Sequence, residues 1–293
     1  MNKIQSFAND RSGCLYLVAT PIGNLEDITF RAVRILKEAD LIAAEDTRQT
    51  RKLLAHLDIA NRLVSYHEHN KHESGPELVR MMKEGKRIAL VSDAGTPAIS
   101  DPGSDLVRLA AAEGIPVVPV PGPNAALSAL IVSGLDTSRF LFLGFLPRGK
   151  KELAACLDEY RGVRATVILY EAPHRIARTL EQLLESWGNR RIALAREVTK
   201  LHEEVFRGTL VEALQDLAEV PPRGEYVIAV EGAQESAARD PDGNWWERMT
   251  VAEHVQAYEL RGLDRKAAVK RAAADRNVPK REIYNEVMKH EQE

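Results

Sequence analysis

The sequence predicts an α/β protein with two tandem α/β domains and a small helical domain at the C-terminus. Short apolar runs alternate with helical patterns in two successive series, which is typical of βαβ units. A long polar loop at residues 91–105 follows one apolar run, and such loops bind ligands in α/β sheets. Residues 251–290 change to three short helical patterns rich in basic residues, so a separate domain is expected there.

Composition limits the classes of function. A chain of 293 residues, with 44% hydrophobic and 28% charged residues, is ordinary for a soluble globular protein of two or three domains. The net charge of −3 means that any nucleic-acid surface must be local. No apolar segment is long enough to span a membrane, and residues 1–13 lack a signal-peptide apolar region, so we expect a cytoplasmic protein. Cys14 and Cys156 match no metal spacing, and neither a disulfide nor zinc is expected.

The first α/β domain is expected at residues 14–135, after a flexible tail at 1–13. Its strands are predicted at 14–19, 41–44, 62–66, 88–91 and 116–120, with helical patterns between them. The turn after the first strand, Thr20 to Asn24, holds only Gly23 of the three glycines in the G-x-G-x-x-G fingerprint. This disfavours a standard NAD or FAD site.

The second α/β domain is expected at residues 136–233. The run at 140–145 reads as a sixth strand that ends the first unit, and the basic segment 147–151 then breaks the pattern, so the boundary lies there or slightly earlier. Strands at 165–170, 191–195, 204–207 and 226–230 alternate with helices at 152–160, 176–187 and 211–217. A polar linker follows at 234–247.

Polar side chains gather where the predicted strands end. Glu45 and Asp46 follow the second strand, Asp93 and Thr96 lie in the 91–105 loop, and Asn124 precedes a helix of small residues. Because carboxyl ends of parallel strands face ligands, these groups are candidates for a shared cleft. For each cluster the alternative is a turn with a helix cap.

Three histidines at residues 67–72 suggest metal binding. Zinc needs further ligands and a supporting second shell, and the sequence offers no obvious one. We therefore interpret this segment as a polar loop that lines the cleft, and expect no metal.

The C-terminal residues 248–293 read as three helices, at 251–260, 264–275 and 280–290. The last two, joined by a tight turn, suggest a helix-turn-helix. Between Arg261 and Arg281 there are eight Lys or Arg against two Asp. This local excess of positive charge favours nucleic-acid binding, and a plain dimerisation or capping domain is the alternative.

Taken together, four motifs resemble the tetrapyrrole methylase family, and within it the branch that methylates RNA. They are Leu17-Val18-Ala19-Thr20-Pro21-Ile22-Gly23-Asn24, Ala39-Asp40 through Glu45-Asp46-Thr47-Arg48, Ser92-Asp93-Ala94-Gly95-Thr96-Pro97 and Val120-Pro121-Gly122-Pro123-Asn124. The resemblance extends over nearly the whole chain. It implies two domains of the tetrapyrrole methylase type with S-adenosylmethionine in the cleft between them, and a homodimer.

The resemblance also implies the substrate and the cofactor contacts. The substrate is the ribose 2′-oxygen of a cytidine in the decoding region of small-subunit (16S) ribosomal RNA, free or in the assembled subunit. The chain lacks the G-x-G-P-G-D turn of relatives that methylate tetrapyrroles, which argues against a porphyrin substrate. The implied cofactor contacts are Pro21, Ile22, Gly23, Asp93, Ala94, Gly95, Thr96, Ile99, Asn124, Ala125, Tyr170, Glu171 and Val198.

Methyl transfer to a hydroxyl requires an in-line arrangement and a means of removing the hydroxyl proton. Asp46 and Glu45 are the candidate bases, and Lys200 or Arg196 could stabilise the developing oxyanion. Candidate phosphate contacts are Arg148, Lys150, Lys151, Arg265, Lys266, Lys270, Arg271, Lys280 and Arg281. The alternatives are a small-molecule methylase of the tetrapyrrole type and a non-catalytic RNA- or ribosome-binding module.

Overall fold

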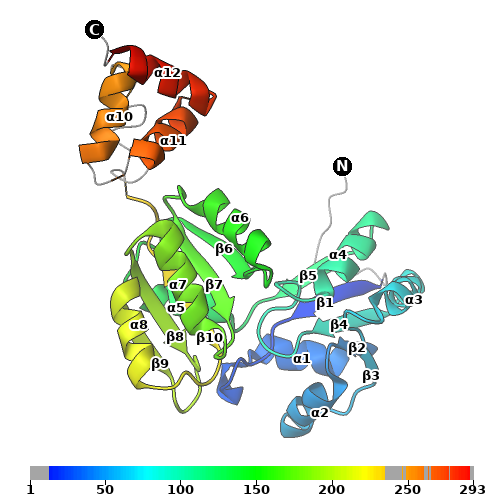
Figure 1. Cartoon of the computed structure of the whole chain (residues 1–293). Helices are drawn as coiled ribbons and strands as arrows, with labels where there is room; N and C mark the ends of the chain where they lie inside the picture. Colours follow the sequence, from blue (N-terminus) through cyan, green and yellow to red (C-terminus); the bar gives the residue numbers. More distant parts are fainter. Residues whose placement is uncertain are drawn as a thin grey trace. The chain divides into compact units, whose positions relative to one another are not determined.

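The computed structural model describes residues 13–234, 246, 249–260, 263, 265–276 and 278–290 (Figure 1). The chain divides into two compact units, Met1–Gly232 and Ala233–Glu293. The predicted tail at 1–13 lies outside the described residues except for Gly13, and the predicted linker at 234–247 does so except for Gln234 and Trp246.

The first unit contains two five-stranded sheets, and the first of them is entirely parallel. Its strand order is β3-β2-β4-β1-β5. The strands are β1 (Cys14–Val18), β2 (Leu41–Ala44), β3 (Leu63–Ser65), β4 (Arg87–Val91) and β5 (Val117–Val120). The helices that connect them are α1 (Phe30–Glu38), α2 (Thr47–His56), α3 (Lys71–Lys83) and α4 (Gly103–Ala112), with a short 3-10 turn at Leu25–Asp27.

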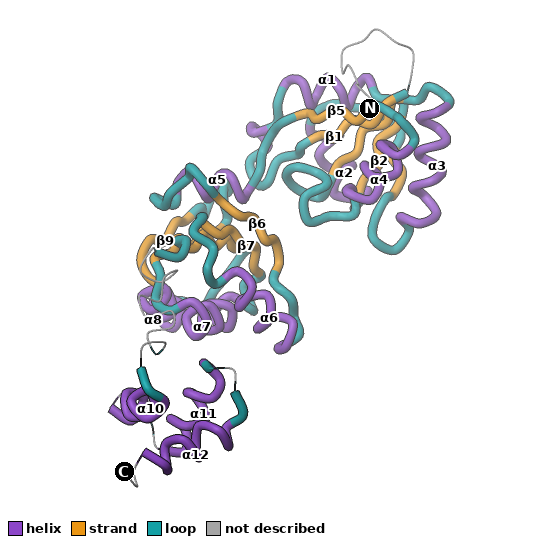
Figure 2. The backbone as a smooth tube through the Cα atoms, turned by 90° about the horizontal axis from the view of Figure 1, so that it is seen from above, coloured by secondary structure: helices purple, strands orange, loops and turns teal. Residues whose placement is uncertain are grey.

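Both faces of this sheet are buried, as the continuous apolar runs require. In β4, Ile88 and Leu90 pack with α3 and α4, whereas Ala89 and Val91 pack with α1 and α2. This alternation follows from the two-residue repeat of a strand. Figure 2 shows helices around the strands of this sheet.

Two adjacent strands, β1 and β4, send the chain in opposite directions. After β1 the chain crosses β4 to reach β2, and after β4 it crosses β1 to reach β5. Such a switch point leaves a crevice outside the carboxyl ends of the strands. The two loops that leave it are joined by a backbone bridge: Thr20 N donates to Gly95 O (2.9 Å) and Gly95 N to Thr20 O (3.0 Å).

The second sheet is mixed. Its order is β6-β7-β10-β8-β9, with β6 parallel to β7 and the other pairs antiparallel. The strands are β6 (Phe140–Phe145), β7 (Thr166–Glu171), β8 (Arg191–Arg196), β9 (Glu204–Thr209) and β10 (Tyr226–Val230). One face is covered by α6 (Lys150–Tyr160), α7 (Ile176–Trp187) and α8 (Leu210–Glu219).

The strand at 140–145 pairs with β7 and so belongs to the second sheet, which agrees with the boundary expected at residue 136. The interpretation of this run as the last strand of the first unit was wrong. An apolar run looks the same whichever sheet receives it, because pairing is decided by tertiary packing. The first sheet ends at β5.

Helix α5 (Ala125–Val132) connects the two sheets physically. It follows β5 of the first sheet, yet Ala126, Ala129 and Leu130 pack on the second sheet against Ile168, Ala195 and Val227. Arg207 on β9 donates through Nε (2.9 Å) and Nη2 (2.6 Å) to the carbonyl of Val132 at the end of this helix. The start of α5 is therefore held between the two sheets.

The helical pattern Ile28, Ala32, Val33, Leu36 offers Thr29 or Asp27 as a cap, and the structure has Thr29: its hydroxyl accepts a hydrogen bond from Ala32 N (3.1 Å), and α1 begins at Phe30. The sequence predicts a helix only from Glu77 to Glu84, but α3 begins at Lys71, with Pro76 inside it. Part of the histidine segment is therefore helical.

The second unit consists of three described helices, α10 (Val251–Leu260), α11 (Arg265–Asp275) and α12 (Lys280–His290). Val255, Ala268, Ala272, Ile283 and Val287 are among its buried core residues. The chain thus has two sheets with their covering helices, followed by helices at the three predicted places. This confirms the predicted fold class.

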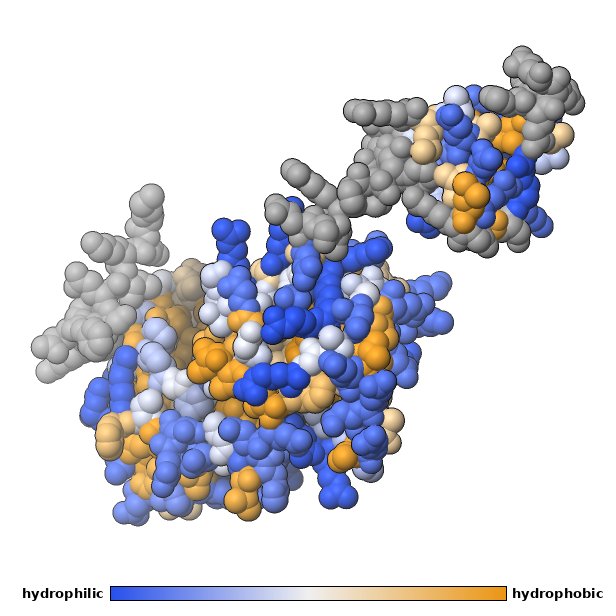
Figure 3. Space-filling view, turned by 90° about the vertical axis from the view of Figure 1, so that its left-hand side faces the viewer, coloured by the Kyte–Doolittle hydropathy of each residue, from blue (hydrophilic) through white to orange (hydrophobic). Residues whose placement is uncertain are grey.

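The molecular surface on the face shown in Figure 3 is mainly hydrophilic, with hydrophobic residues scattered between. Within the described ranges, every helix is too short or too polar to cross a bilayer.

Gly144 provides a test of the β6–β7 arrangement. The register shifts between Phe142 and Gly144, and Gly144 has φ +65°, a left-handed conformation that favours glycine. A Cβ there would lie 2.8 Å from Ser100 Oγ. We expect Gly144→Ala to lower the free energy of unfolding by about 1–2 kcal/mol, measured by urea denaturation.

Gly162→Ala is the matched control, because no atom lies within 4 Å of its added Cβ. Its effect should stay within about 0.5 kcal/mol. Equal unfolding free energies for the two variants would contradict the strained bulge.

Candidate functional site

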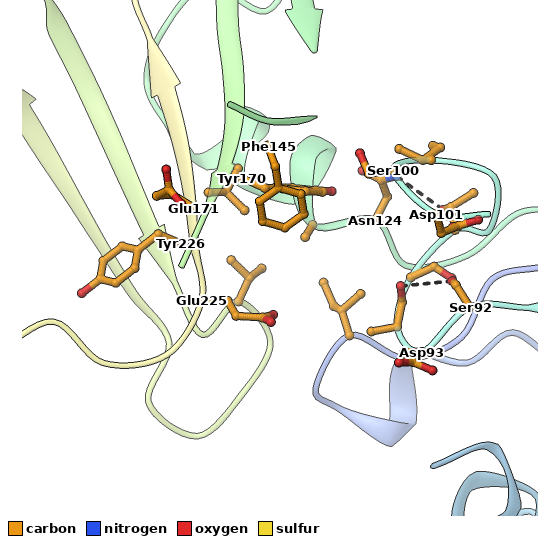
Figure 4. Close-up of a pocket in the computed structure, with 18 of the residues that line it drawn as sticks. Ser92, Asp93, Ser100, Asp101, Asn124, Phe145, Tyr170, Glu171, Glu225 and Tyr226 are labelled. Carbon is orange, nitrogen blue, oxygen red and sulfur yellow. Dashed lines mark hydrogen bonds between the residues drawn. The ribbon is translucent and has the colours of Figure 1, made fainter. Parts of the chain in front are cut away.

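A pocket of about 390 Å³ lies at the switch point of the first sheet and is closed by residues of the second. Figure 4 shows Ser92, Asp93, Ser100, Asp101 and Asn124 on one side, facing Phe145, Tyr170, Glu171, Glu225 and Tyr226. This volume suits a small organic ligand. The lining residues are Ile22, Glu45, Ser92, Asp93, Ala94, Gly95, Thr96, Ile99, Ser100, Asp101, Asn124, Ala125, Phe145, Tyr170, Glu171, Ala172, Glu197, Val198, Lys200, Glu225, Tyr226 and Val227.

The loop after β4 has a fixed, strained shape. Asp101 Oδ1 accepts hydrogen bonds from Ala98 N (2.9 Å) and Gly103 N (2.7 Å), closing the loop onto the start of α4. Ala98 and Ser100 adopt φ of 69° and 61°, which is unfavourable for residues with a Cβ. Backbone strain of this kind concentrates at functional sites. Asp101 therefore has a structural role in holding this loop.

The start of α5 is tied to the same loop. Thr96 Oγ1 donates to Pro123 O (3.1 Å) and accepts from Asn124 Nδ2 (3.4 Å). Asn124 Oδ1 caps the helix by accepting from Leu127 N (3.0 Å). Because Asn124 and Ala125 both line the pocket, the positive end of the α5 dipole lies at its wall.

Aromatic rings from the second sheet form the opposite wall. Phe142 and Phe145 meet the Tyr170 ring edge to face, with centroids 5.0 and 5.6 Å away. Burial raises the pKa of Tyr170, so its hydroxyl stays protonated. The bulge at Gly144 leaves the Phe145 side chain 57% exposed at the pocket.

Glu171 is turned into the second domain. Its side chain is only 1% exposed, and its oxygens accept from Ala172 N (2.9 Å) and Thr179 Oγ1 (2.6 Å) while Arg175 Nε lies 3.3 Å away. A buried carboxylate requires such partners. Glu171 therefore shapes the turn after β7.

The turn after β1 packs against the loop after β8. Asn24 N donates to Thr199 Oγ1 (3.2 Å), and a Cβ at Gly23 would lie 2.3 Å from Lys200 Cγ. Glu197 and Thr199 in this loop have φ of 50° and 69°. Gly23 is thus required for close contact between the domains.

All the predicted cofactor contacts line the pocket except Pro21 and Gly23. Gly23 is covered by Lys200, which itself lines the pocket and holds Glu197 Oε1 at 2.9 Å. The sequence pattern identified the turn, but not which of its residues the opposite loop would cover.

The pocket is acidic. One lining residue, Lys200, is basic, whereas six are acidic. Five of them are Glu45, Asp93, Asp101, Glu197 and Glu225, and the sixth is Glu171, whose carboxylate is buried against Thr179 and Arg175. Such a lining attracts a positively charged ligand and repels phosphate.

The two candidate bases differ in environment. Burial, followed by the charges of Asp93 and Asp101, raises the pKa of Glu45, which lines the pocket. Asp46 is outside the lining: its carboxylate caps α2 by accepting from Arg48 N (2.8 Å) and pairs with the Arg48 side chain, which lowers its pKa to about 2. Asp46 Oδ1 is thereby occupied, and a carboxylate with so low a pKa is a weak base.

Arg196, the other candidate outside the main pocket, pairs with Glu204 and lines a second pocket. The candidate phosphate contacts are all exposed. Arg265 pairs with Glu259 and Arg271 with Asp275, so part of their charge is neutralised within the second unit.

The histidine segment at residues 67–72 belongs to no metal-binding cluster within the described ranges. In the part of the chain that the structure describes, no cluster of three or more His, Cys, Asp or Glu is suited to a metal ion. The backbone N of His67 donates to Asn70 Oδ1 (2.8 Å). No residue of this segment lines the main pocket, so its interpretation as a loop that lines the cleft was wrong.

Several lining residues were not predicted. Phe145 is the last residue of β6 and Ala172 follows β7, so the rule that ligand contacts lie at strand ends could have found them. Glu225 and Tyr226 lie at the start of antiparallel β10, whose direction the sequence pattern does not give.

Comparison with known proteins agrees with this arrangement. Residues 14–214 match the model of the Tetrapyrrole (Corrin/Porphyrin) Methylases. A protein of Halalkalibacterium halodurans named "Ribosomal RNA small subunit methyltransferase I" is 56% identical over 94% of this chain and 95% of its own. The protein of the same name from Bacillus subtilis is 52% identical over 93% of each chain.

Among solved structures, uroporphyrin-III C-methyltransferase from Thermus thermophilus, complexed with S-adenosyl homocysteine, is similar in fold. It has a TM-score of 0.54 and 22% identity, and the match covers 75% of this chain and 97% of that one. The family match and the two relatives confirm the resemblance seen in the sequence motifs. The chain belongs to the tetrapyrrole methylase family.

Proposed function

We propose that this chain is an S-adenosylmethionine-dependent methyltransferase of small-subunit ribosomal RNA. In the finer form of the proposal, the acceptor is the ribose 2′-oxygen of a cytidine in the decoding region, and the enzyme acts as a homodimer in the cytoplasm. Either free 16S rRNA or the assembled small subunit could present this nucleotide.

The observation that carries the proposal is likeness over the full length to relatives named for this RNA. The Halalkalibacterium match spans 276 of the 293 residues, so it includes most of the basic C-terminal unit. The porphyrin methyltransferase structure is covered almost completely by 75% of this chain. A tetrapyrrole methylase would have no use for the basic C-terminal unit. A protein that only binds RNA would have no use for the pocket.

The residues of the main pocket suit S-adenosylmethionine. This cofactor carries a positively charged sulfonium and supplies the methyl group, and the acidic lining complements that charge. Ile22, Ile99, Val198 and Tyr170 offer apolar surface for an adenosine. The start of α5 at Asn124 offers a positive dipole end for a carboxylate.

The chain's own contribution to the chemistry is positioning and proton removal. We assign Glu45 as the base, since a carboxylate with a raised pKa accepts a hydroxyl proton more readily than one near pKa 2. Lys200 lines the same pocket and is our candidate for stabilising the acceptor oxygen as it loses its proton. Asp46 holds the start of α2 beside Glu45, with Asp46 N donating to Asp93 Oδ1 (2.9 Å).

RNA binding is assigned to the exposed cations outside the pocket. Lys266, Lys270, Lys280 and Arg281 on α11 and α12 are exposed. These helices suit the predicted helix-turn-helix, while Arg148, Lys150 and Lys151 supply a second basic segment.

The proposed homodimer is supported by apolar residues on α5. Leu127 and Ile131, one helical turn apart, are 46% and 74% exposed, and Val132 is 40% exposed. A helix that is apolar all round and packs on a sheet by one side is suited to burial on the other. A second copy would provide that burial.

Replacing Glu45 by Gln should lower kcat by about 100-fold or more, because the base is lost while the shape is kept. Cofactor affinity, measured by isothermal titration calorimetry, should change little. In the parent enzyme, kcat should fall as the pH drops through the raised pKa of Glu45, since only the ionised carboxylate accepts a proton, and Glu45→Gln should lose this dependence.

Asp46→Asn is the matched control, and it should weaken the α2 cap and stability more than kcat. Near-normal turnover of Glu45→Gln would exclude a carboxylate base at this position.

Reversing charge at Lys266, Lys270 and Arg281 together should weaken rRNA binding in a salt-dependent manner. Each lost phosphate contact makes the plot of log K against log salt less steep by about 0.7–0.9. Filter binding over a range of salt concentrations measures this, with cofactor affinity unchanged.

The control reverses three exposed cations of the first domain, Lys37, Arg51 and Lys52. If both triple variants lost the same affinity for rRNA, the effect of the C-terminal substitutions would be explained by net charge alone.

Ile131→Glu should convert a dimer into a monomer, because a charge on the exposed α5 face opposes its burial. Size-exclusion chromatography with light scattering measures the mass. Phe30→Glu, at a side chain 98% exposed on α1, is the control and should stay dimeric. A dimeric Ile131→Glu variant or a monomeric parent would contradict the proposed interface.

A further inference from the structure

A second pocket, of about 500 Å³, adjoins the first. It is lined by Arg196, Glu197, His202, Val220, Pro221, Arg223 and Gly224. Glu197 lines both pockets, so the two share a wall. That wall is well fixed: Glu197 has φ 50°, and its Oε1 accepts from Lys200 Nζ (2.9 Å) and Glu225 N (3.4 Å).

The charge of the second pocket is opposite to that of the first. Glu197 is paired with Lys200, and Glu204 is paired with Arg196. Arg223 and His202 lie on the same lining, and across the described ranges no ion pair joins Arg223 to a carboxylate. The second pocket therefore presents cationic and N–H donor groups beside a cavity with six acidic residues.

An RNA substrate needs such a site. When a ribose hydroxyl reaches the main pocket, the phosphates on either side of that ribose must remain outside it, because the carboxylates repel them. The second pocket, which shares Glu197 with the main pocket, carries the guanidinium groups of Arg196 and Arg223. Val220 and Pro221 add apolar surface that can contact a ribose or a base.

We propose that the second pocket binds a backbone phosphate of the RNA next to the nucleotide that is methylated. This rests on the proposed function, and extends it from the basic C-terminal unit to the catalytic unit itself. Arg196, held by Glu204 and 21% exposed, is a preorganised donor. Arg223 completes a pair of guanidinium groups, which bind phosphate through parallel N–H donors. His202 offers a ring N–H in either protonation state.

Arg223→Ala in the full-length chain tests the proposal. We expect the KM for unmodified small subunits to rise about tenfold, with kcat and cofactor affinity unchanged, because the phosphate is held outside the reacting centre. The salt slope of rRNA binding should become less steep by about 0.7–0.9, as for one phosphate contact. Arg223→Lys should recover part of the affinity, since it keeps the charge without the fork.

Arg178→Ala is the control, because Arg178 is an exposed arginine on α7 that lines neither pocket. If Arg223→Ala matched Arg178→Ala in both KM and salt slope, the phosphate site would be excluded. A change in cofactor affinity with an unchanged salt slope would also overturn it. If the parent chain transferred no methyl group to RNA, the proposed function would fail, while the salt slopes would still decide whether the pocket contacts phosphate.

Discussion

The two hydrogen bonds between Thr20 and Gly95 are the constraint on which the site depends. They join the loops that leave β1 and β4, two neighbouring strands that send the chain in opposite directions across the first sheet. Parallel strands bring these loops to the same edge, but without a bridge two long loops could separate. Thr20 is buried and its hydroxyl donates to Ser92 O (3.4 Å), so a further hydrogen bond holds the bridging residue in place. Asp101 and the left-handed residues then shape the loop beyond it.

A second constraint holds the opposite wall in place. Helix α5 leaves the first sheet and packs on the second, and the Gly23–Lys200 contact joins the domains at another point. Neither contact lies within one sheet, so the pocket exists only when both sheets are folded. This explains why strained residues are tolerated on both sides: tertiary contacts determine conformations that local preference would reject.

Sequence patterns predicted the alternation of strands and helices, and the strand-end position of most pocket residues, because both follow from burial and chain direction. They could not predict side-chain orientation. Glu171 lines the pocket, yet its carboxylate is directed toward Thr179. Asp46 and Glu45 are adjacent, yet one caps a helix while the other lines the pocket. Phe140–Phe145 reads as a strand in either domain, and its partner β7 lies further along the chain.

The separation of charge follows from the chemistry proposed here. A cationic cofactor is best held among carboxylates, and a carboxylate with a raised pKa is also a better base. The same carboxylates repel the polyanion that carries the acceptor hydroxyl, so binding energy for RNA must come from surfaces outside the cavity. A ribose hydroxyl can enter an acidic pocket because it is neutral. The phosphates on either side of that ribose must then be bound by cationic groups at the edge of the pocket. Glu197 forms part of the wall that the main pocket shares with the second pocket, and its charge is neutralised by Lys200. It therefore lies at the boundary between the acidic cofactor pocket and the cationic site proposed for phosphate.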